Sequence, residues 1–248
     1  MIKVKGLSKS FGPIRAVDKV SFSVAKGDVL GFLGPNGAGK TTTMKMISCF
    51  LPPDSGTAKV MGHDVVADSV AARRCIGYVA ENAPAYDEMT TESFLHFVCE
   101  ARGMNRRTRK AKTEEIAERC AISDVMHQLI GTLSKGYRRR VGLAQALVHN
   151  PPVLILDEPT DGLDPNQKHA VRQLIQELAA EKYIIISTHI LEEVDAICNR
   201  IVIIDRGRIQ VNSTASKLSS RYEGKPLNEI FRELTTGRRA AGVVGGTA

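Results

Sequence analysis

The segment from Gly34 to Thr41 reads G-P-N-G-A-G-K-T and matches the pattern G-x-x-x-x-G-K-T. The glycines at 34, 37 and 39 can adopt backbone angles closed to other residues, so successive N–H groups can form a concavity for an anion. Lys40 adds a positive charge, and the Thr41 hydroxyl is expected to hold the Mg²⁺ that bridges the terminal phosphates of a nucleotide. The residues predicted to bind the nucleotide are Gly34, Pro35, Asn36, Gly37, Ala38, Gly39, Lys40, Thr41 and Thr42.

The sequence on both sides of this loop has the order that the motif requires. Val29–Leu33 is a short apolar run, and Met44–Ile47 fits a buried helix face. A helix that begins after the loop directs its free N–H groups and its dipole at the phosphates. A chance match in a glycine-rich turn is the alternative, and the strand, loop and helix order argues against it.

Three further polar positions follow apolar runs. Glu81 follows 75–79, Asp157 and Glu158 follow 153–156, and His189 follows 184–187 together with Thr188. In an open parallel sheet, ligands bind beyond the carboxyl ends of the strands, so we expect these groups and the glycine loop to converge on one crevice.

Each of these side chains has a predicted task at a triphosphate. A carboxylate at the end of a hydrophobic strand is costly unless it has a partner, and Mg²⁺ held through water offers one to Asp157. Glu158 is placed to polarise, or accept a proton from, the water that attacks the γ-phosphate. A neutral His189 could hydrogen-bond the γ-phosphate region, and Glu81 could contact Mg²⁺ or its water. The alternatives are a turn or helix cap before Pro159, a core or capping histidine, and a solvated loop carboxylate.

Composition limits the possible classes of protein. The 248 residues suffice for one sizeable core with a subdomain. No apolar run approaches the roughly 18 to 20 residues that cross a bilayer, and the start of the chain lacks the apolar region of a secretory signal. The 5 cysteines are scattered without a C-x-x-C pair, which favours reduced thiols and argues against a metal site. These features predict a protein that stays in the cytoplasm and reaches a membrane only through a partner.

The chain has a formal net charge of +7. Basic residues cluster at 102–112 and at 138–140. A solvated helix face, anionic lipid headgroups and nucleic acid are all open as explanations. Aromatic residues make up only 5% of the chain, and none lies within the first cluster, so binding to nucleic acid is disfavoured.

Alternating strand and helix patterns predict an α/β fold with a mostly parallel sheet. Short strands punctuated by glycines favour antiparallel pairing within residues 1–27, and 87–150 has no convincing strand, which predicts an all-helical insertion. Asp164 and Pro165 have the residue types of a helix N-cap and first turn. The expected strands are 2–4, 20–24, 29–33, 75–79, 153–156, 183–186 and 201–204, and one expected helix is 137–148.

The order of these motifs resembles the ATP-binding cassette (ABC) ATPases. The resemblance depends on the glycine loop, Leu133–Tyr137, Val153–Pro159, Gly162–Asp164 and His189, and it covers about residues 1–235. It implies a P-loop NTPase core, an N-terminal antiparallel β-subdomain and the helical insertion at about 87–150. The remaining residues, 236–248, are expected to be a disordered tail.

The resemblance also implies a head-to-tail dimer in which ATP is bound between the glycine loop of one copy and the signature segment 133–137 of the other. A hydroxyl at Ser134 and a bare backbone at Gly136, at a helix N-terminus, suit a second anion site. Phe11 matches the aromatic residue that stacks on adenine, and Val17 lies where an aliphatic residue packs beside it. An ordinary core ring is the alternative for Phe11.

Two positions depart from the family pattern. Glu81 replaces the usual Gln, and the signature has Lys135 and Tyr137 where Gly and Gln are commoner. A carboxylate at 81 could still orient metal-bound water, but it would change metal affinity.

The segments 77–82, 133–137 and 227–235 resemble the ATPase subunits of bacterial ABC-2 type exporters, including multidrug and gliding-motility members. This implies ATP hydrolysis that powers export through a separate permease, with the protein at the inner face of the cell membrane and no nucleic acid as partner. A soluble ABC ATPase that acts on ribosomes or DNA is the alternative. A nucleotide sensor without turnover would be expected to lack Glu158, which this chain has.

Overall fold

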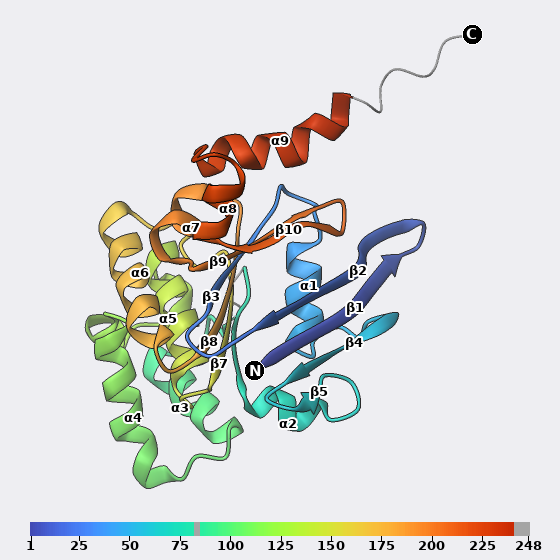
Figure 1. The fold of residues 1–248 in the computed structure, drawn as a ribbon. Coiled ribbons are helices and arrows are strands. Elements are labelled where there is room, and N and C mark those ends of the chain that lie inside the picture. The colour runs from blue at the N-terminus through green and yellow to red at the C-terminus, as the bar shows by residue number, and fades with distance from the viewer. Residues whose placement is uncertain (82–84, 241–248) are drawn as a thin grey trace.

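The computed structural model describes residues 1–81 and 85–240, with side chains up to 235, and contains two β-sheets. The larger sheet has the strand order β10-β9-β3-β8-β7-β6 and the smaller has the order β2-β1-β4-β5 (Figure 1). The strands are β1 Ile2–Phe11, β2 Ile14–Val24, β3 Val29–Leu33, β4 Ser55–Val60, β5 His63–Asp64, β6 Ile76–Val79, β7 Val153–Asp157, β8 Tyr183–Thr188, β9 Arg200–Asp205 and β10 Arg208–Thr214.

The larger sheet is parallel except at one edge, where β10 pairs antiparallel with β9. Strands β3, β7, β8 and β9 are buried on both faces, which explains why they are near-continuous aliphatic runs. Along β3, for example, Leu30 and Phe32 pack in one hydrophobic core while Val29 and Leu33 pack in the other.

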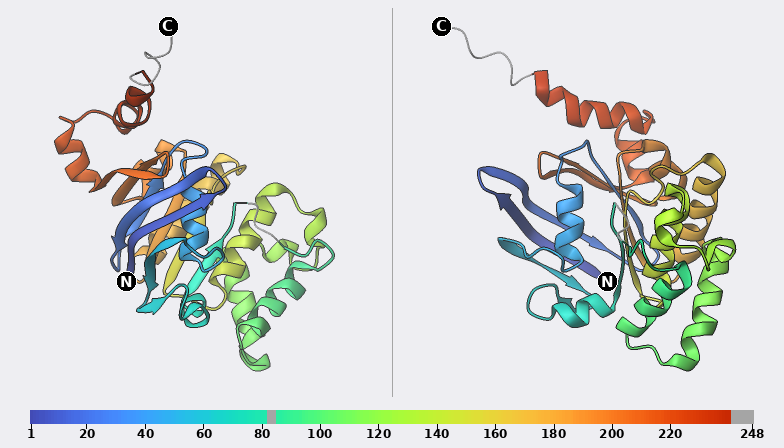
Figure 2. Two further views of the ribbon diagram at one scale, coloured as in Figure 1. Left: turned by 90° about the vertical axis from the view of Figure 1, so that its right-hand side faces the viewer. Right: turned by 180° about the vertical axis from the view of Figure 1, so that it is seen from behind.

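Helix α1, Lys40–Ile47, lies between the two sheets, where it contacts β1, β2 and β4 on one side and β7 and β8 on the other. The views in Figure 2 show the same layering, with the antiparallel sheet and the larger sheet on opposite sides of this helix. The other face of the larger sheet is covered by helices. The remaining helices are α2 Ser69–Arg74, α3 Thr91–Ala101, α4 Arg106–Arg119, α5 Lys135–Leu147, α6 Pro165–Ala179, α7 Leu191–Ile197, α8 Ala215–Arg221 and α9 Leu227–Ala240.

The predicted helical insertion contains α3, α4 and α5 with two short 3₁₀ turns, 123–125 and 130–132. Its only strand-like feature among the described residues is an isolated bridge between Thr90 and Leu129. Helix α5 contacts both α3 and α4 and also packs along β6, so it links the insertion to the larger sheet. The expected caps are present, since the Asp164 side chain accepts a hydrogen bond from the backbone N–H of Gln167 and Pro165 begins α6.

The sequence analysis missed β4, β5 and β10. Gly56, Gly62 and polar residues interrupt these short or edge strands, so they lack the aliphatic runs that marked the others. Helix α9 continues to Ala240, so residues 236–240 of the expected tail are helical, and the rest of that tail lies outside the described residues.

None of the helices in the described ranges combines the length and apolar character needed to cross a bilayer. All five cysteines are free thiols. Burial raises the pKa of Cys120 and of Cys198 to about 12, and that of Cys49 to about 11.

The packing of α5 against β6 places a histidine in an unusual environment. The His149 ring Nε2 lies 3.1 Å from the Ile76 carbonyl oxygen, to which it donates when neutral. Burial, followed by the charge of Arg102, lowers the pKa of His149 to about 4.

The unfolded chain takes up a proton at His149 near its ordinary pKa of about 6.5, whereas the folded chain does so only near 4. Folding stability should therefore fall as the pH drops from about 6.5, by about 2 kcal/mol at pH 5. In His149→Gln, which keeps an amide donor, this part of the pH dependence should disappear. Urea unfolding of both proteins at pH 7 and 5 measures the difference, and equal losses would contradict it.

Candidate active site

The register of the larger sheet brings the ends of four strands to one level. Leu33 pairs with Thr188, Asp157 with Ser187, and Val79 with Leu156. The residues that leave these ends are the glycine loop after β3, His189 after β8, Glu158 after β7 and Glu81 after β6. The convergence expected from the sequence is thus produced by strand pairing.

The glycine loop folds against the β9–β10 turn. Gly37 and Gly39 have φ of 78° and 104°, as expected. Gly34 does not have a positive φ, so its expected conformational role is wrong. Glycine is needed at this position for lack of space, because a Cβ there would lie 2.5 Å from the Ile204 carbonyl oxygen. The first turn of α1 has no side-chain cap, so its N–H groups remain available to an anion.

Lys40 lies under the loop with its ammonium enclosed. Its Nζ donates to the carbonyl oxygens of Gly34, at 2.8 Å, and Pro35, at 3.3 Å. Burial lowers the pKa of Lys40, and the negative charges of Glu158, Asp157 and Glu81 oppose this shift. The cation is therefore held where phosphate oxygens would meet the loop.

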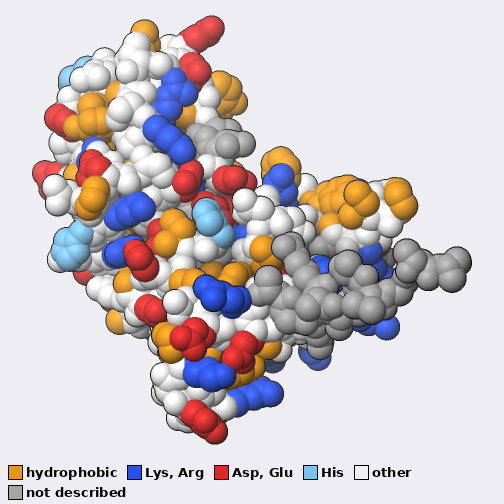
Figure 3. All heavy atoms as spheres, turned by 90° about the horizontal axis from the view of Figure 1, so that it is seen from above, with side chains coloured by type: hydrophobic (Ala, Val, Ile, Leu, Met, Phe, Trp, Pro, Cys, Tyr) orange, Lys and Arg blue, Asp and Glu red, His pale blue; other side chains and the backbone are white. Residues whose placement is uncertain are grey.

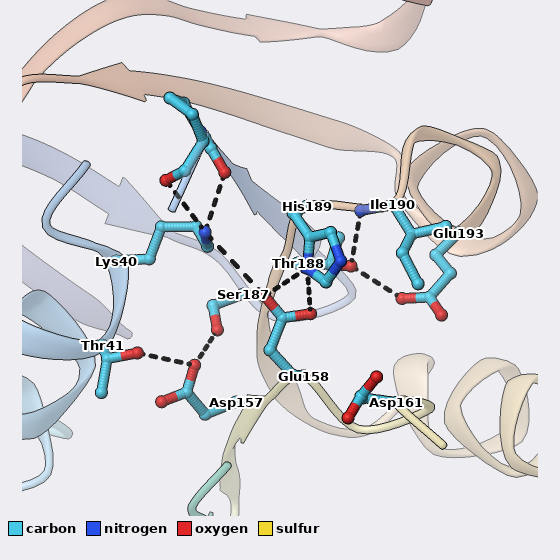
Figure 4. Close-up of polar contacts among 12 residues, drawn as sticks. Lys40, Thr41, Asp157, Glu158, Asp161, Ser187, Thr188, His189, Ile190 and Glu193 are labelled. Atoms are coloured by element: carbon cyan, nitrogen blue, oxygen red, sulfur yellow. Dashed lines mark hydrogen bonds and ion pairs between the residues drawn. The ribbon is translucent and has the colours of Figure 1, made fainter. Parts of the chain in front are cut away.

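The Glu158 carboxylate lies between two basic groups. Its Oε1 is 3.9 Å from Lys40 Nζ, and both of its oxygens are 3.0 Å from His189 Nδ1 (Figure 4). Glu158 is buried, whereas the His189 side chain is 46% exposed and so connects the carboxylate to solvent. Glu158 does begin a turn, as one alternative expected, because its carbonyl oxygen accepts from the Asp161 backbone N–H at 3.2 Å. Its carboxylate nevertheless lies against Lys40 and His189, and the half-exposed His189 is not a core histidine.

Asp157 has one satisfied and one unsatisfied oxygen. Its Oδ1 accepts hydrogen bonds from Ser187 Oγ and, at 3.5 Å, from Thr41 Oγ1. Its Oδ2 is buried without a hydrogen-bond partner among the described residues. A hydroxyl beside a carboxylate with a free oxygen is the kind of oxygen donor set that Mg²⁺ accepts, so these residues fit the ion.

Glu81 lies beside the other acidic groups. It lines, with Thr41 and Asp157, a cavity of about 1240 Å³ between α1 and α2 on one side and α3, α4 and α5 on the other. The negative charges of Asp157 and Glu81 add to burial in raising the pKa of Tyr78, another lining residue. Glu81 therefore borders the same cavity as Thr41 and Asp157.

Ser134 and Gly136 lie at the N-terminus of α5. The Ser134 hydroxyl accepts from the Tyr137 backbone N–H at 3.3 Å, and Lys135 Nζ donates to Asp161 Oδ2 at 2.8 Å. A Cβ on Gly136 would lie 2.4 Å from Gln167 Oε1, so a larger residue here would have to displace the end of the Gln167 side chain. No hydrogen bond or ion pair in the described ranges joins Ser134 or Gly136 to the glycine loop.

The two residues expected near adenine differ in exposure. Phe11 ends β1 with its residue 50% exposed, so the alternative of a core ring is wrong. Val17 is fully buried, and its Cγ2 would be 3.3 Å from a Cβ on Gly39. Val17 therefore packs against the glycine loop and presents no surface to a base. This differs from its expected position beside adenine, because the Val17 side chain of β2 points into the core.

Sequence reasoning missed three residues that complete the site. Ser187 holds Asp157, and buried Glu193 accepts from Thr188 Oγ1 at 2.9 Å next to His189. Arg139 is also buried, although the cluster 138–140 left a solvated face open as an explanation. Its spacing of three and four from Gly136 and Leu143, both on the buried face of α5, could have revealed it.

The surface around the site contains charges of both signs. Seen from above, the molecule has an L-shaped outline, and acidic, basic and histidine side chains gather near its inner corner (Figure 3). The cluster 102–112 is largely exposed, and some of its charges have acidic neighbours, such as Arg109 with Glu100 and Lys112 with Glu115.

Comparison with known proteins shows the family to which this chain belongs. The family described as ABC transporter matches residues 17–161. The ABC transporter ATP-binding protein NatA of Bacillus subtilis (strain 168) is 37% identical over 88% of this chain and 89% of its own length. The daunorubicin resistance ATP-binding protein DrrA3 of Streptomyces coeruleorubidus is 36% identical over 94% of this chain and 74% of its own.

Solved structures share the fold. The structure of an ATP-binding subunit of an ABC transporter has a TM-score of 0.87 at 29% identity and covers 94% of this chain and 99% of that chain. A dimeric bacterial ABC transporter cassette, at 24% identity, has a TM-score of 0.81 over 86% of this chain and 98% of that one.

The chain is thus a P-loop ATPase built on a parallel sheet with an added antiparallel sheet, as the sequence predicts. It belongs to the ABC transporter family, in which it is an ATP-binding and ATP-hydrolysing subunit.

Removing the enclosed cation should remove most of the affinity for ATP. Lys40→Ala should weaken ATP binding at least about 100-fold, because hydrogen bonds to charged groups contribute up to about 3 kcal/mol each. Calorimetric titration with ATP measures the change. Lys45→Ala is the matched control, since Lys45 lies on the same helix with its Nζ 5.9 Å from the Phe50 ring centroid. Equal affinities in the two variants would show that Lys40 does not face the phosphates.

Proposed function

We propose that ATP hydrolysis at this site powers export through a separate membrane permease. The observation that supports the chemistry best is the buried Glu158 carboxylate, fixed between Lys40 and His189 at the end of β7. The drug-resistance relative supports export as the direction of transport.

In this proposal, the loop from Gly34 to Thr42 and the start of α1 surround the phosphates of ATP, and Lys40 turns from the loop carbonyls to the phosphate oxygens. Thr41 and Asp157 hold Mg²⁺, and Glu81 contacts the ion or its water. When bound, Mg²⁺ neutralises charge on the terminal phosphates and so makes the γ-phosphorus easier to attack. Phe11, exposed at the end of β1, stacks on the adenine ring.

Glu158 then takes a proton from the attacking water. Its carboxylate is close to two positive or proton-donating groups, which hold it in one orientation before water binds. His189 meets the γ-phosphate region on its exposed side and responds to the loss of that phosphate. The proposed roles of Glu158 and His189 need no rearrangement of these two side chains, which are already in contact.

A second copy of the chain completes the site. Ser134 and Gly136 have no bond to the glycine loop of their own chain, and the N-terminus of α5 offers free N–H groups and a positive dipole. A head-to-tail pair would place this second half-site over the triphosphate bound by the partner. The dimeric cassette of the same fold supports this assembly.

The permease docks, in this proposal, on the helical insertion and on the cavity beside it. Phe50 and Phe97 line that cavity with residues 74% and 45% exposed. The same cavity reaches Thr41, Glu81 and Asp157, so a segment bound there would lie next to the residues proposed to hold Mg²⁺. In this proposal the protein works at the inner face of the cell membrane. The relatives named as transporter subunits favour a permease over ribosomes or DNA as the partner.

Glu158→Gln should bind ATP normally, accumulate a dimer and hydrolyse ATP at least about 100-fold more slowly, because it lacks the general base. Glu81→Gln is the control carboxylate and should keep most of its turnover. Phosphate release and size-exclusion chromatography with saturating Mg-ATP measure both properties. A strictly monomeric Glu158→Gln protein, or an equal loss of turnover in the two variants, would contradict these roles.

Purification from membranes in detergent tests the permease. The wild-type chain and Val66→Asp should copurify with an integral membrane protein, because Val66 is exposed outside the cavity. Phe50→Asp should lose that protein while it retains ATP binding. Recovery of free chain alone, with affinity for RNA or DNA that falls steeply with salt, would favour the alternative function.

A further inference from the structure

The guanidinium of Arg139 binds backbone at the ends of two strands. It donates to the carbonyl oxygens of Ala80 at 3.0 Å and Glu81, beyond β6, and to those of Asp157 at 2.7 Å and Pro159 at 3.3 Å. Arg139 is only 5% exposed. Four of its five N–H donors are therefore used inside the protein, all on main-chain oxygens.

Two of these carbonyls lie on either side of Glu158. The Asp157 carbonyl belongs to the peptide group before Glu158, and the Pro159 carbonyl follows one residue after it. One planar group thus fixes the backbone on both sides of the residue that takes the proton in the proposed reaction.

Glu158 needs such support because its backbone is unfavourable. Its φ is 51°, in the left-handed region that residues with a Cβ rarely adopt. Its own N–H donates to Ser187 at 2.9 Å, and its carbonyl accepts from Asp161 at 3.2 Å. Such conformations persist only where the surroundings hold them.

The charge of Arg139 is not used in an ion pair. No carboxylate within the described ranges lies within 4.0 Å of its nitrogens, although Asp157, Asp161, Glu158 and Glu81 are near enough to oppose the effect of burial on its pKa. The hydrogen bonds of Arg139 therefore all go to backbone carbonyl oxygens, while its positive charge offsets the negative charges of the surrounding carboxylates.

We propose that Arg139 is a positioning residue for ATP hydrolysis, which holds Glu158 in its left-handed conformation and so aims the carboxylate at the attacking water. Arg139 lies on α5, whose first turn contains Ser134 and Gly136. It also connects the signature half-site to the catalytic carboxylate of the same chain. This inference rests on the proposed role of Glu158.

A double-mutant cycle separates positioning from a purely structural role. Arg139→Lys keeps the charge but lacks the planar arrangement of donors that spans both strand ends. It should lower kcat at least tenfold and change KM for ATP less than threefold. In the Glu158→Gln background the same substitution should lower the residual turnover less than twofold, because a residue that acts through Glu158 has nothing left to position.

Hydrogen exchange gives a second readout that does not depend on turnover. Without nucleotide, Arg139→Lys should speed exchange severalfold at the backbone amides of Glu158 and Asp161. Arg140→Lys is the matched control, since its guanidinium lies 4.2 Å from the Tyr137 ring centroid and binds Ala121 rather than the strand ends. That variant should change kcat less than twofold and leave both amides unaffected.

The outcomes distinguish the two proposals. A wild-type protein that hydrolyses no ATP defeats the proposed function, whereas unchanged exchange at both amides defeats the role of Arg139. Equal losses of turnover with and without Glu158 would also overturn it, because they indicate a general structural effect. Thermal unfolding identifies the folded variants, and Arg139→Gln supplies the same cycle where Arg139→Lys does not fold.

Discussion

Parallel pairing with level strand ends is the constraint on which this site depends. Strands β6, β7, β8 and β3 are buried on both faces, so polar groups can leave the sheet only where the strands end. Because neighbouring strands pair in register, these ends meet along one edge. The same hydrophobic packing that stabilises the sheet therefore concentrates lysine, hydroxyl, carboxylate and imidazole groups in a small volume. Helix α1 and the glycine loop border this volume on one side.

Inside that volume the buried cations and the carboxylates are not paired one to one. Lys40 and Arg139 are both buried and both donate to backbone carbonyls, while Asp157, Glu158 and Glu81 supply the negative charge around them. Neither cation neutralises one carboxylate completely. An arrangement of this kind leaves Asp157 Oδ2 unsatisfied and leaves Lys40 able to change partners, which a set of closed ion pairs would not permit.

The sequence predicted the central strands and the phosphate loop because each depends on local signals. Continuous aliphatic runs marked β3, β7, β8 and β9, and fixed glycine spacing marked the loop. Edge strands β5 and β10 and the short strand β4 were missed, since their stability comes from pairing with other strands rather than from their own composition. Side chains whose contacts come from distant parts of the chain were missed for the same reason. Asp157 and Glu158 were found because they end a strand, whereas the contacts of Arg139 with residues 80, 81, 157 and 159 join segments far apart in the chain.

The interior cysteines bear on how the motions of this protein can be followed. The thiolate is the form of cysteine that attacks thiol reagents, and a group with a pKa of about 12, as at Cys120 and Cys198, is almost wholly protonated at neutral pH. Both side chains are also shielded from collision with reagents. Replacing half-buried Cys75 and Cys49 would leave a nearly silent background. A fluorophore attached to one introduced surface cysteine would then follow the proposed pairing of two copies in real time.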